Sequence, residues 1–182
     1  MPFDGIYITR YITPHAMELT VIEDIVRTSG FLTLGSRLRR IGERLQADTQ
    51  QFIDEAGLGI QAGQYPFLAA IDRAGPLTIG ELAQSVGITQ PGATRTVGQL
   101  VELDLVAIEP SASDQRRKLV SLTPRGQQLI DLSRAEIWPR IAAAVTDLCG
   151  SLDGPILDQL SAIEDGLAAA PLIRRAPATE TN

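Results

Sequence analysis

The feature that most constrains this fold is a pair of closely spaced helix-start signals in the stretch TIGELAQSVGITQPG. Thr78 and Glu81 have the spacing of a capping box, in which the hydroxyl and the carboxylate satisfy free backbone amides at a helix start. Gly87 can adopt the left-handed conformation that ends a helix, and Thr89 with Pro91 in the next turn can start a second one. The sequence therefore predicts two short helices joined by a glycine turn, which is a helix-turn-helix.

Apolar residues recur at helical spacing along one face of each predicted helix, and the second helix is expected to run to about Leu103. We expect these positions to be buried and the opposite faces to meet solvent. The apolar positions are Ile79, Leu82, Ala83 and Val86 in the first helix and Ala93, Val97 and Leu100 in the second.

Two β-rich runs follow, LVAIEP and KLVSLT, separated by the polar loop SASDQRR. A hairpin directly after a helix-turn-helix predicts a winged helix, which we assign to residues 58-126. The chain is acidic, with a formal net charge of −6, yet between Ser111 and Gly126 four cations accompany the single acid Asp114. Because electrostatic fields are short-ranged at physiological salt, this local excess of positive charge matters more than the acidity of the whole chain.

A heptad seam marks the segment before the winged helix, residues 18-57. Gly30 and Gly35 are expected to weaken or bend a long helix that runs from about Glu18 to Ile53. The seam can pack within one chain, although a helix this long in a small protein favours packing on another subunit. Its apolar residues are Phe31, Leu34, Leu38, Ile41 and Leu45, with Phe52 continuing it.

After the winged helix, a long helix is expected from Pro124 towards Leu148, with a kink at Pro139. Asp153 is expected to cap a last helix. Residues 127-170, together with residues 18-57, are predicted to form a helical dimerisation region.

The two ends of the chain are predicted to lie outside this framework. Residues 1-17 have the alternation of a short strand or extended arm, and residues 171-182 have the composition of a disordered tail. The start of the chain lacks the pattern of a signal peptide, and no apolar stretch is long enough to cross a membrane. The sequence therefore predicts a cytoplasmic protein with no membrane partner.

One cysteine and one histidine exclude several classes of site. Cys149 alone cannot form a disulfide framework or a cysteine-rich zinc site, and His15 alone cannot form a histidine metal cluster. No phosphate-binding glycine loop and no nucleophile–base pair can be assembled from the sequence. We therefore predict no enzyme, no metal and no cofactor, and we expect Cys149 to be structural.

Taken together, these motifs resemble the MarR-type winged-helix transcriptional regulators from roughly residue 20 to residue 168. The stretch LTIGELAQSVGITQPGATRTVGQL fits the helix-turn-helix of that family, and QYPFLAAI fits the preceding helix. Asp104 stands where the family usually has glycine, and aspartate tolerates the left-handed conformation better than most residues. The family's wing pattern is filled at every position, by Asp114, Arg116, Val120, Leu122, Thr123 and Gly126.

The resemblance implies a mainly α fold with a small β-hairpin wing, and a second helix that enters the DNA major groove. There Gln90 can pair with adenine, Arg95 with guanine or phosphate, and Thr94 with either base or phosphate. Arg116 holds the family's position for insertion into the minor groove, and Asp114 would brace the wing arginines. The predicted DNA-binding residues are Thr89, Gln90, Pro91, Thr94, Arg95, Arg116, Arg117 and Lys118.

The family further implies a homodimer that represses nearby genes at a pseudo-palindromic operator and is released by a small, often aromatic, ligand. Tyr65 and Trp138 are expected to be core residues; the alternative is that either lines an effector cleft, and Tyr65 is the candidate effector-binding residue. The alternative function is a winged-helix protein-interaction module that has lost DNA binding, which the acidity of the chain and Asp104 favour. A salt-dependent DNA-binding measurement separates the two, because phosphate contacts release counterions.

Overall fold

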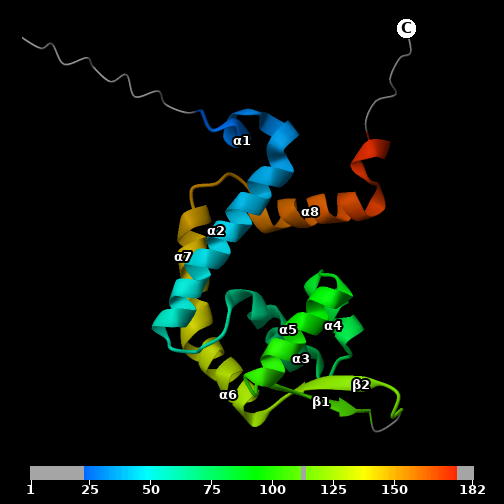
Figure 1. Cartoon of the computed structure of the whole chain (residues 1–182). Helices are drawn as coiled ribbons and strands as arrows, with labels where there is room; N and C mark the ends of the chain where they lie inside the picture. Colours follow the sequence, from blue (N-terminus) through cyan, green and yellow to red (C-terminus); the bar gives the residue numbers. More distant parts are fainter. Residues whose placement is uncertain (1–22, 112–113, 176–182) are drawn as a thin grey trace, which may run out of the picture. The chain divides into compact units, whose positions relative to one another are not determined.

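The computed structural model describes residues 23–111 and 114–175 (Figure 1). The predicted arm, residues 1-17, lies outside the described residues, as do residues 176–182 of the predicted tail. The chain divides into two compact units between Glu43 and Arg44, and each unit is described separately. No helix within the described ranges is both long enough and apolar enough to cross a bilayer.

The first unit shows that the long helix predicted from about Glu18 is broken. A four-residue helix, α1 (Ile25–Thr28), and a 3-10 turn, η1 (Gly30–Thr33), precede α2 (Leu34–Glu55). Gly30 has φ 57°, in the left-handed region that interrupts a right-handed helix. The predicted weak point at Gly30 is therefore a full break, whereas α2 continues through Gly35.

The second unit contains the predicted winged helix. The helix-turn-helix follows one leading helix, and both start signals are confirmed: Thr78 and Glu81 form the capping box, and Thr89 caps the second helix. Gly87 ends the first helix with φ 74°. The elements are η2 (Ala62–Gln64), α3 (Tyr65–Ala74), α4 (Ile79–Val86), α5 (Gln90–Glu102), β1 (Val106–Pro110) and β2 (Lys118–Leu122). The fold is thus mainly α with a β-hairpin wing, as predicted.

One hydrophobic core holds these elements together. The predicted inner faces of α4 and α5 meet the apolar face of α3, and β2 and the following helix close the core. The predicted positions Ile79 and Val86 are only partly buried at its edge. The fully or nearly fully buried members include Phe67, Leu68, Ile71, Leu82, Ala83, Ala93, Val97, Leu100, Val120 and Ile130.

The hairpin is antiparallel, with Ile108 paired to Val120 at its centre and Pro110 paired to Lys118 at its loop end. A third segment joins it, which the sequence did not predict. Leu77, just before α4, exchanges two backbone hydrogen bonds with Val120, at 3.1 and 2.7 Å. The wing is therefore tied by backbone hydrogen bonds to the start of the helix-turn-helix.

The long helix predicted from Pro124 is divided into three parts: α6 (Pro124–Leu132), a π-helical segment η3 (Ser133–Ile137), and α7 (Trp138–Cys149). The wide turn ends just before Pro139, where the kink was predicted. Proline has no amide hydrogen and its ring crowds the carbonyl four residues earlier, so a local widening of the helix relieves the clash. The sequence located the irregularity but did not identify its π-helical form.

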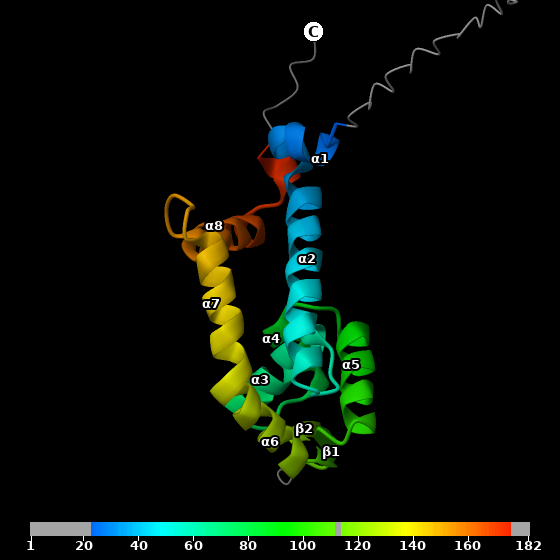
Figure 2. The same ribbon diagram turned by 90° about the vertical axis from the view of Figure 1, so that its left-hand side faces the viewer.

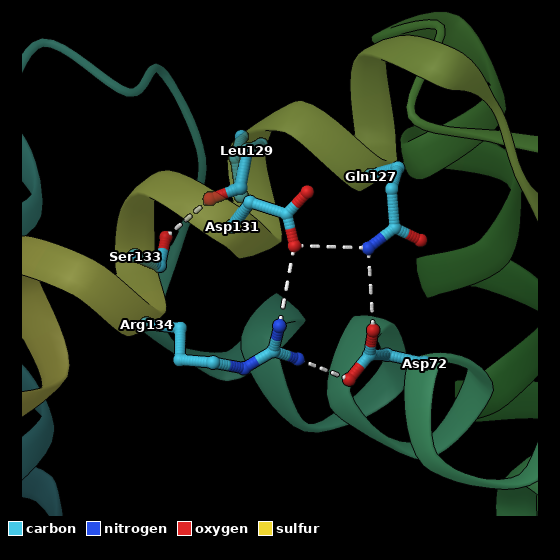
Figure 3. Close-up of polar contacts among 6 residues, drawn as sticks. All are labelled: Asp72, Gln127, Leu129, Asp131, Ser133 and Arg134. Atoms are coloured by element: carbon cyan, nitrogen blue, oxygen red, sulfur yellow. Dashed lines mark hydrogen bonds and ion pairs between the residues drawn. The ribbon is translucent and has the colours of Figure 1, made fainter.

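A polar network joins α3 to α6 and η3 (Figure 3). Arg134 donates to Asp72 on α3 and to Asp131 one turn before it, at 3.2 Å in the second case. Gln127 donates to the same two carboxylates. Because Asp72 and Asp131 each accept from both Gln127 and Arg134, these hydrogen bonds hold the start of the π-helical segment against α3.

In the second unit, α7 packs alongside the later part of α2. Arg140 pairs with Glu55 at 3.3 Å, and its guanidinium lies 5.3 Å from the ring centre of Phe52. Between the two helices lies a groove of 230 Å³ whose lining is mainly apolar. The lining residues are Leu45, Asp48, Thr49, Phe52, Ile141, Ala144, Val145 and Leu148.

The last helix, α8, spans Ile156–Ala169, and a 3-10 turn, η4 (Leu172–Arg174), follows it. The cap predicted at Asp153 is wrong: Pro155 is the N-cap residue and makes no side-chain cap hydrogen bond. Gly154, with φ 82°, turns the chain between Asp153 and the helix, so the aspartate is too early to reach the first amides. The turn η4 lies within residues 171-182, which were predicted to be a disordered tail.

Gly126 should be intolerant of any side chain. It is buried at the start of α6, and an added Cβ would lie 2.0 Å from the carbonyl oxygen of Leu105. We expect Gly126→Ala to lower the free energy of unfolding by about 1–3 kcal/mol, because the helix must shift away from the backbone of Leu105. The matched control is Gly98→Ala on the exposed face of α5, which has open space and should gain about 0.5–1 kcal/mol. Urea denaturation of both variants checks this, and equal effects would contradict it.

Candidate nucleic-acid interface

The N-terminus of α5 is rigidly capped and open to solvent. The hydroxyl of Thr89 accepts a hydrogen bond from the amide of Gly92 at 3.4 Å, and Pro91 occupies the first turn. Thr89, Gln90 and Pro91 are exposed. The remaining free amides and the positive end of the helix dipole make this point suitable for a phosphate oxygen.

The next turn of α5 presents two more of the predicted residues. Thr94 and Arg95 are exposed, whereas Ala93 and Val97 on the opposite face are fully buried. The Thr94 hydroxyl donates to the carbonyl of Gln90 at 3.0 Å, which leaves its oxygen available as an acceptor. The core therefore fixes which face of α5 is offered to a partner, and all five predicted residues of this helix start lie on the exposed side.

On the wing, Arg116, Arg117 and Lys118 are all exposed. Asp114 accepts from the backbone amide of Arg116 at 3.0 Å, and its carbonyl accepts from the amide of Arg117 at 2.9 Å. Asp114 thus shapes the turn that carries the arginines through their backbone. Among the described residues, no ion pair joins its carboxylate to an arginine side chain.

Arg117 has a partner that the sequence did not reveal. Its guanidinium donates to Glu81 of α4 at 3.1 Å. The pKa of Glu81 is lowered, first by the backbone amide of Thr78, then by the Thr78 hydroxyl, and further by Arg117. The capping box showed that Glu81 would be ordered, but nothing in the local sequence places β2 against α4.

Asp104 confirms the expectation for the turn between α5 and β1. It has φ 56° and is the only non-glycine residue with a positive φ among the described residues. Its carbonyl accepts a hydrogen bond from the hydroxyl of Thr123 at 2.7 Å. The turn keeps the left-handed conformation although it lacks glycine.

Tyr65 lies in the interior of the second unit. Its hydroxyl shares a 2.7 Å hydrogen bond with Ser133, and its ring meets Trp138 edge-on with centres 6.4 Å apart. Burial raises the pKa of Tyr65, and the hydrogen bond with Ser133 partly opposes that rise. Tyr65 is not part of the lining of the groove between α2 and α7.

In the described segments, no three residues among histidine, cysteine, aspartate and glutamate come together as a metal site. The winged-helix lobe, which comprises η2 to β2 and the start of α6, has an exposed helix start and an exposed basic hairpin packed on one core. Those features define a winged helix-turn-helix protein.

Comparison with known proteins agrees with this class. Residues 58–117 match the sequence model of the MarR family. An uncharacterised helix-turn-helix transcriptional regulator of Staphylococcus aureus strain Mu50 is 36% identical over 73 residues, which are 40% of this chain and 50% of that protein. The chain thus spans about half the length of the curated relatives it matches.

Two solved structures share the fold. One is a cysteine-to-serine mutant of MarR from E. coli complexed with operator DNA, with a TM-score of 0.62 and 20% identity over 81% of this chain and 98% of that one. The other concerns regulation of DNA binding of Bordetella bronchiseptica BpsR by 6-hydroxynicotinic acid, with a TM-score of 0.59 and 23% identity over 75% and 94%. The winged-helix part of the chain therefore resembles the MarR-family transcriptional regulators in sequence, and its fold is theirs.

The conformation of Asp104 generates a stability prediction. A left-handed residue with a Cβ costs about 1–2 kcal/mol, and aspartate is better tolerated there than alanine. We expect Asp104→Gly to be at least as stable as the wild type and Asp104→Ala to be about 1 kcal/mol less stable than Asp104→Gly. Glu102→Ala, at a neighbouring helical acid, is the control and should change little. Thermal unfolding of the three variants checks the order, and an alanine variant as stable as the glycine variant would refute it.

Proposed function

We propose that this chain is a cytoplasmic, DNA-binding transcriptional repressor that acts as a homodimer on a pseudo-palindromic operator. The observation that carries the proposal is the exposure of two separate elements, a helix start and a basic wing turn, that pack on one hydrophobic core. These are the capped start of α5, with Gln90, Thr94 and Arg95, and the wing turn with Arg116. The E. coli relative complexed with operator DNA supports the same use of the fold.

In this proposal α5 reads bases and the wing supplies affinity. A helix whose N-terminal residues enter the major groove offers Gln90 for bidentate pairing with adenine, and Arg95 for guanine or phosphate. Arg116 enters the minor groove, where a narrow groove deepens the negative potential. The hydrogen bonds of Asp114 to the turn keep the Arg116 backbone in one position, which lowers the entropy lost on binding.

Arg116→Ala and Gln90→Ala should affect DNA binding in different ways. Removing Arg116 should weaken binding to operator and scrambled DNA alike, and lower the slope of log K against log salt by about 0.9 per half-site. Removing Gln90 should narrow the gap between operator and mismatched operator by about 1–3 kcal/mol at one position and leave the slope nearly intact.

The measurement is a titration on both DNAs at three salt concentrations. Arg73→Ala is the matched control, since Arg73 is exposed in the same lobe but lies on neither α5 nor the wing. If Arg116→Ala binds both DNAs as the wild type does, the wing has no role in DNA binding. The alternative function, a protein-interaction module, then gains support; the acidity of the chain and the pairing of Arg117 with Glu81 agree with it.

The homodimer is supported by apolar side chains that each unit leaves exposed. In the first unit Phe31 and Leu32 are 92% and 89% exposed. In the second, one stripe of α8 with Leu160, Ile163 and Leu167 is exposed, at 36%, 40% and 49%. Monomeric proteins rarely leave contiguous apolar surface of this kind in water, and a second copy of the same helices can cover it.

We therefore expect light scattering during size-exclusion chromatography to give about twice the 19.6 kDa of one chain at micromolar concentration. Ile163→Glu should weaken the dimer, because the new charge would be buried in the interface while the protomer, where this side chain is exposed, stays folded. Gln159→Glu adds the same charge beside the stripe and should leave the mass unchanged. A wild type that elutes as a monomer would overturn this part of the proposal.

We extend the proposal to relief of repression by a small ligand, with aromatic compounds among the candidates. The support is the regulation of DNA binding by 6-hydroxynicotinic acid in the Bordetella protein and the mainly apolar groove between α2 and α7. A ligand releases the operator if it favours a spacing of the two lobes that no longer matches successive grooves of the duplex. Tyr65 was proposed from the sequence as an effector residue. Its hydroxyl is hydrogen-bonded to Ser133 in the core of the same unit.

A further inference from the structure

The ion pair between Arg117 and Glu81 joins the wing to the helix-turn-helix. The wing pattern that this chain fills specifies Asp114 and Arg116 and leaves the position of Arg117 unspecified. The guanidinium of Arg117 lies 3.1 Å from Glu81 Oε1, and the two side chains are 55% and 46% exposed.

Both partners are held in place before they meet. Glu81 Oε2 accepts from the amide and from the hydroxyl of Thr78, each at 2.8 Å, which leaves Oε1 for Arg117. On the wing, the carbonyl of Arg117 accepts from the amide of Ser111 at 2.8 Å, and its amide donates to the carbonyl of Asp114. Because the carboxylate and the wing backbone are already ordered, the pair forms with a small further loss of entropy.

We propose that Glu81 is an internal counter-ion that limits the affinity of this protein for DNA phosphate by neutralising Arg117. The inference rests on the proposed DNA-binding function and adds a positioning residue, since Glu81 acts only through the arginine. The pair is half exposed, so a phosphate oxygen and the Glu81 carboxylate compete for the same guanidinium. Arg116 is then the wing cation that binds the DNA duplex, whereas Arg117 stays paired with Glu81.

Glu81→Gln tests this without removing the helix cap. Glutamine is accepted at this capping-box position, and its side-chain oxygen can still accept from the amide of Thr78. If the released Arg117 displaces one more counterion, the slope of log K against log salt steepens by about 0.9 per half-site, and affinity at 0.1 M salt rises roughly tenfold. The gain should appear on operator and on scrambled DNA, because phosphate contacts carry no sequence information.

The matched control is Glu102→Gln, which removes the same charge from an exposed site at the end of α5. It should raise affinity less and leave the slope unchanged. In an Arg117→Ala background, Glu81→Gln should no longer steepen the slope. Circular dichroism and the unfolding midpoint of each variant confirm that the lobe is folded.

The outcomes separate the inference from the function. If the wild type binds operator with a salt-dependent affinity and Glu81→Gln has the same slope, the inference is overturned and the proposed function stands. A gain that persists without Arg117 also overturns it, because the effect would then be one of general charge. If the wild type binds neither DNA at any salt concentration, the proposed function fails and the inference fails with it.

Discussion

Val120 is the residue on which the arrangement of the winged-helix lobe depends. Its side chain is fully buried, and its backbone pairs with Ile108 on one side and with Leu77 on the other. The hairpin is therefore fixed to the segment that leads into α4, and it cannot swing independently of the helix-turn-helix. A two-stranded hairpin alone is marginally stable in water, so this tie and the burial of Val120 keep the wing ordered.

The same tie explains why charges from distant parts of the sequence meet. When β2 lies beside Leu77, the residues just before β2, including Arg117, come close to the first turn of α4. The capping box holds Glu81 in that turn. Glu81, the acid of the capping box, therefore lies opposite Arg117 on the wing. One carboxylate then stabilises a helix start and modifies the charge that the wing presents to solvent.

The junction between α6 and α7 follows from a different constraint. Pro139 prevents a regular helix, and the π-helical segment before it brings the hydroxyl of Ser133 to Tyr65. Arg134 then reaches Asp72 across the gap between helices (Figure 3). In the view of Figure 2, α6 and α7 follow one another with this segment between them. The polar network fixes the direction in which α7 leaves α6, and with it the position of the groove beside α2.

The sequence by itself determined the elements whose signals are local. Thr78, Gly87 and Thr89 set the ends of two helices because capping bonds and left-handed turns involve residues only a few positions apart. Asp104 kept its turn for the same reason, and the spacing of Val97 and Leu100 determined which face of α5 is buried and which is left for Gln90 and Arg95.

Local signals failed where the same short stretch was compatible with more than one helix start. Asp153 had the side chain of a cap, but Gly154 and Pro155 moved the helix start beyond its reach. Only the tertiary structure decided that Leu77 pairs with Val120 and that Glu81 forms an ion pair with Arg117. These contacts join residues far apart in the chain, and their partners are set by how the apolar faces pack, which no short stretch of sequence records.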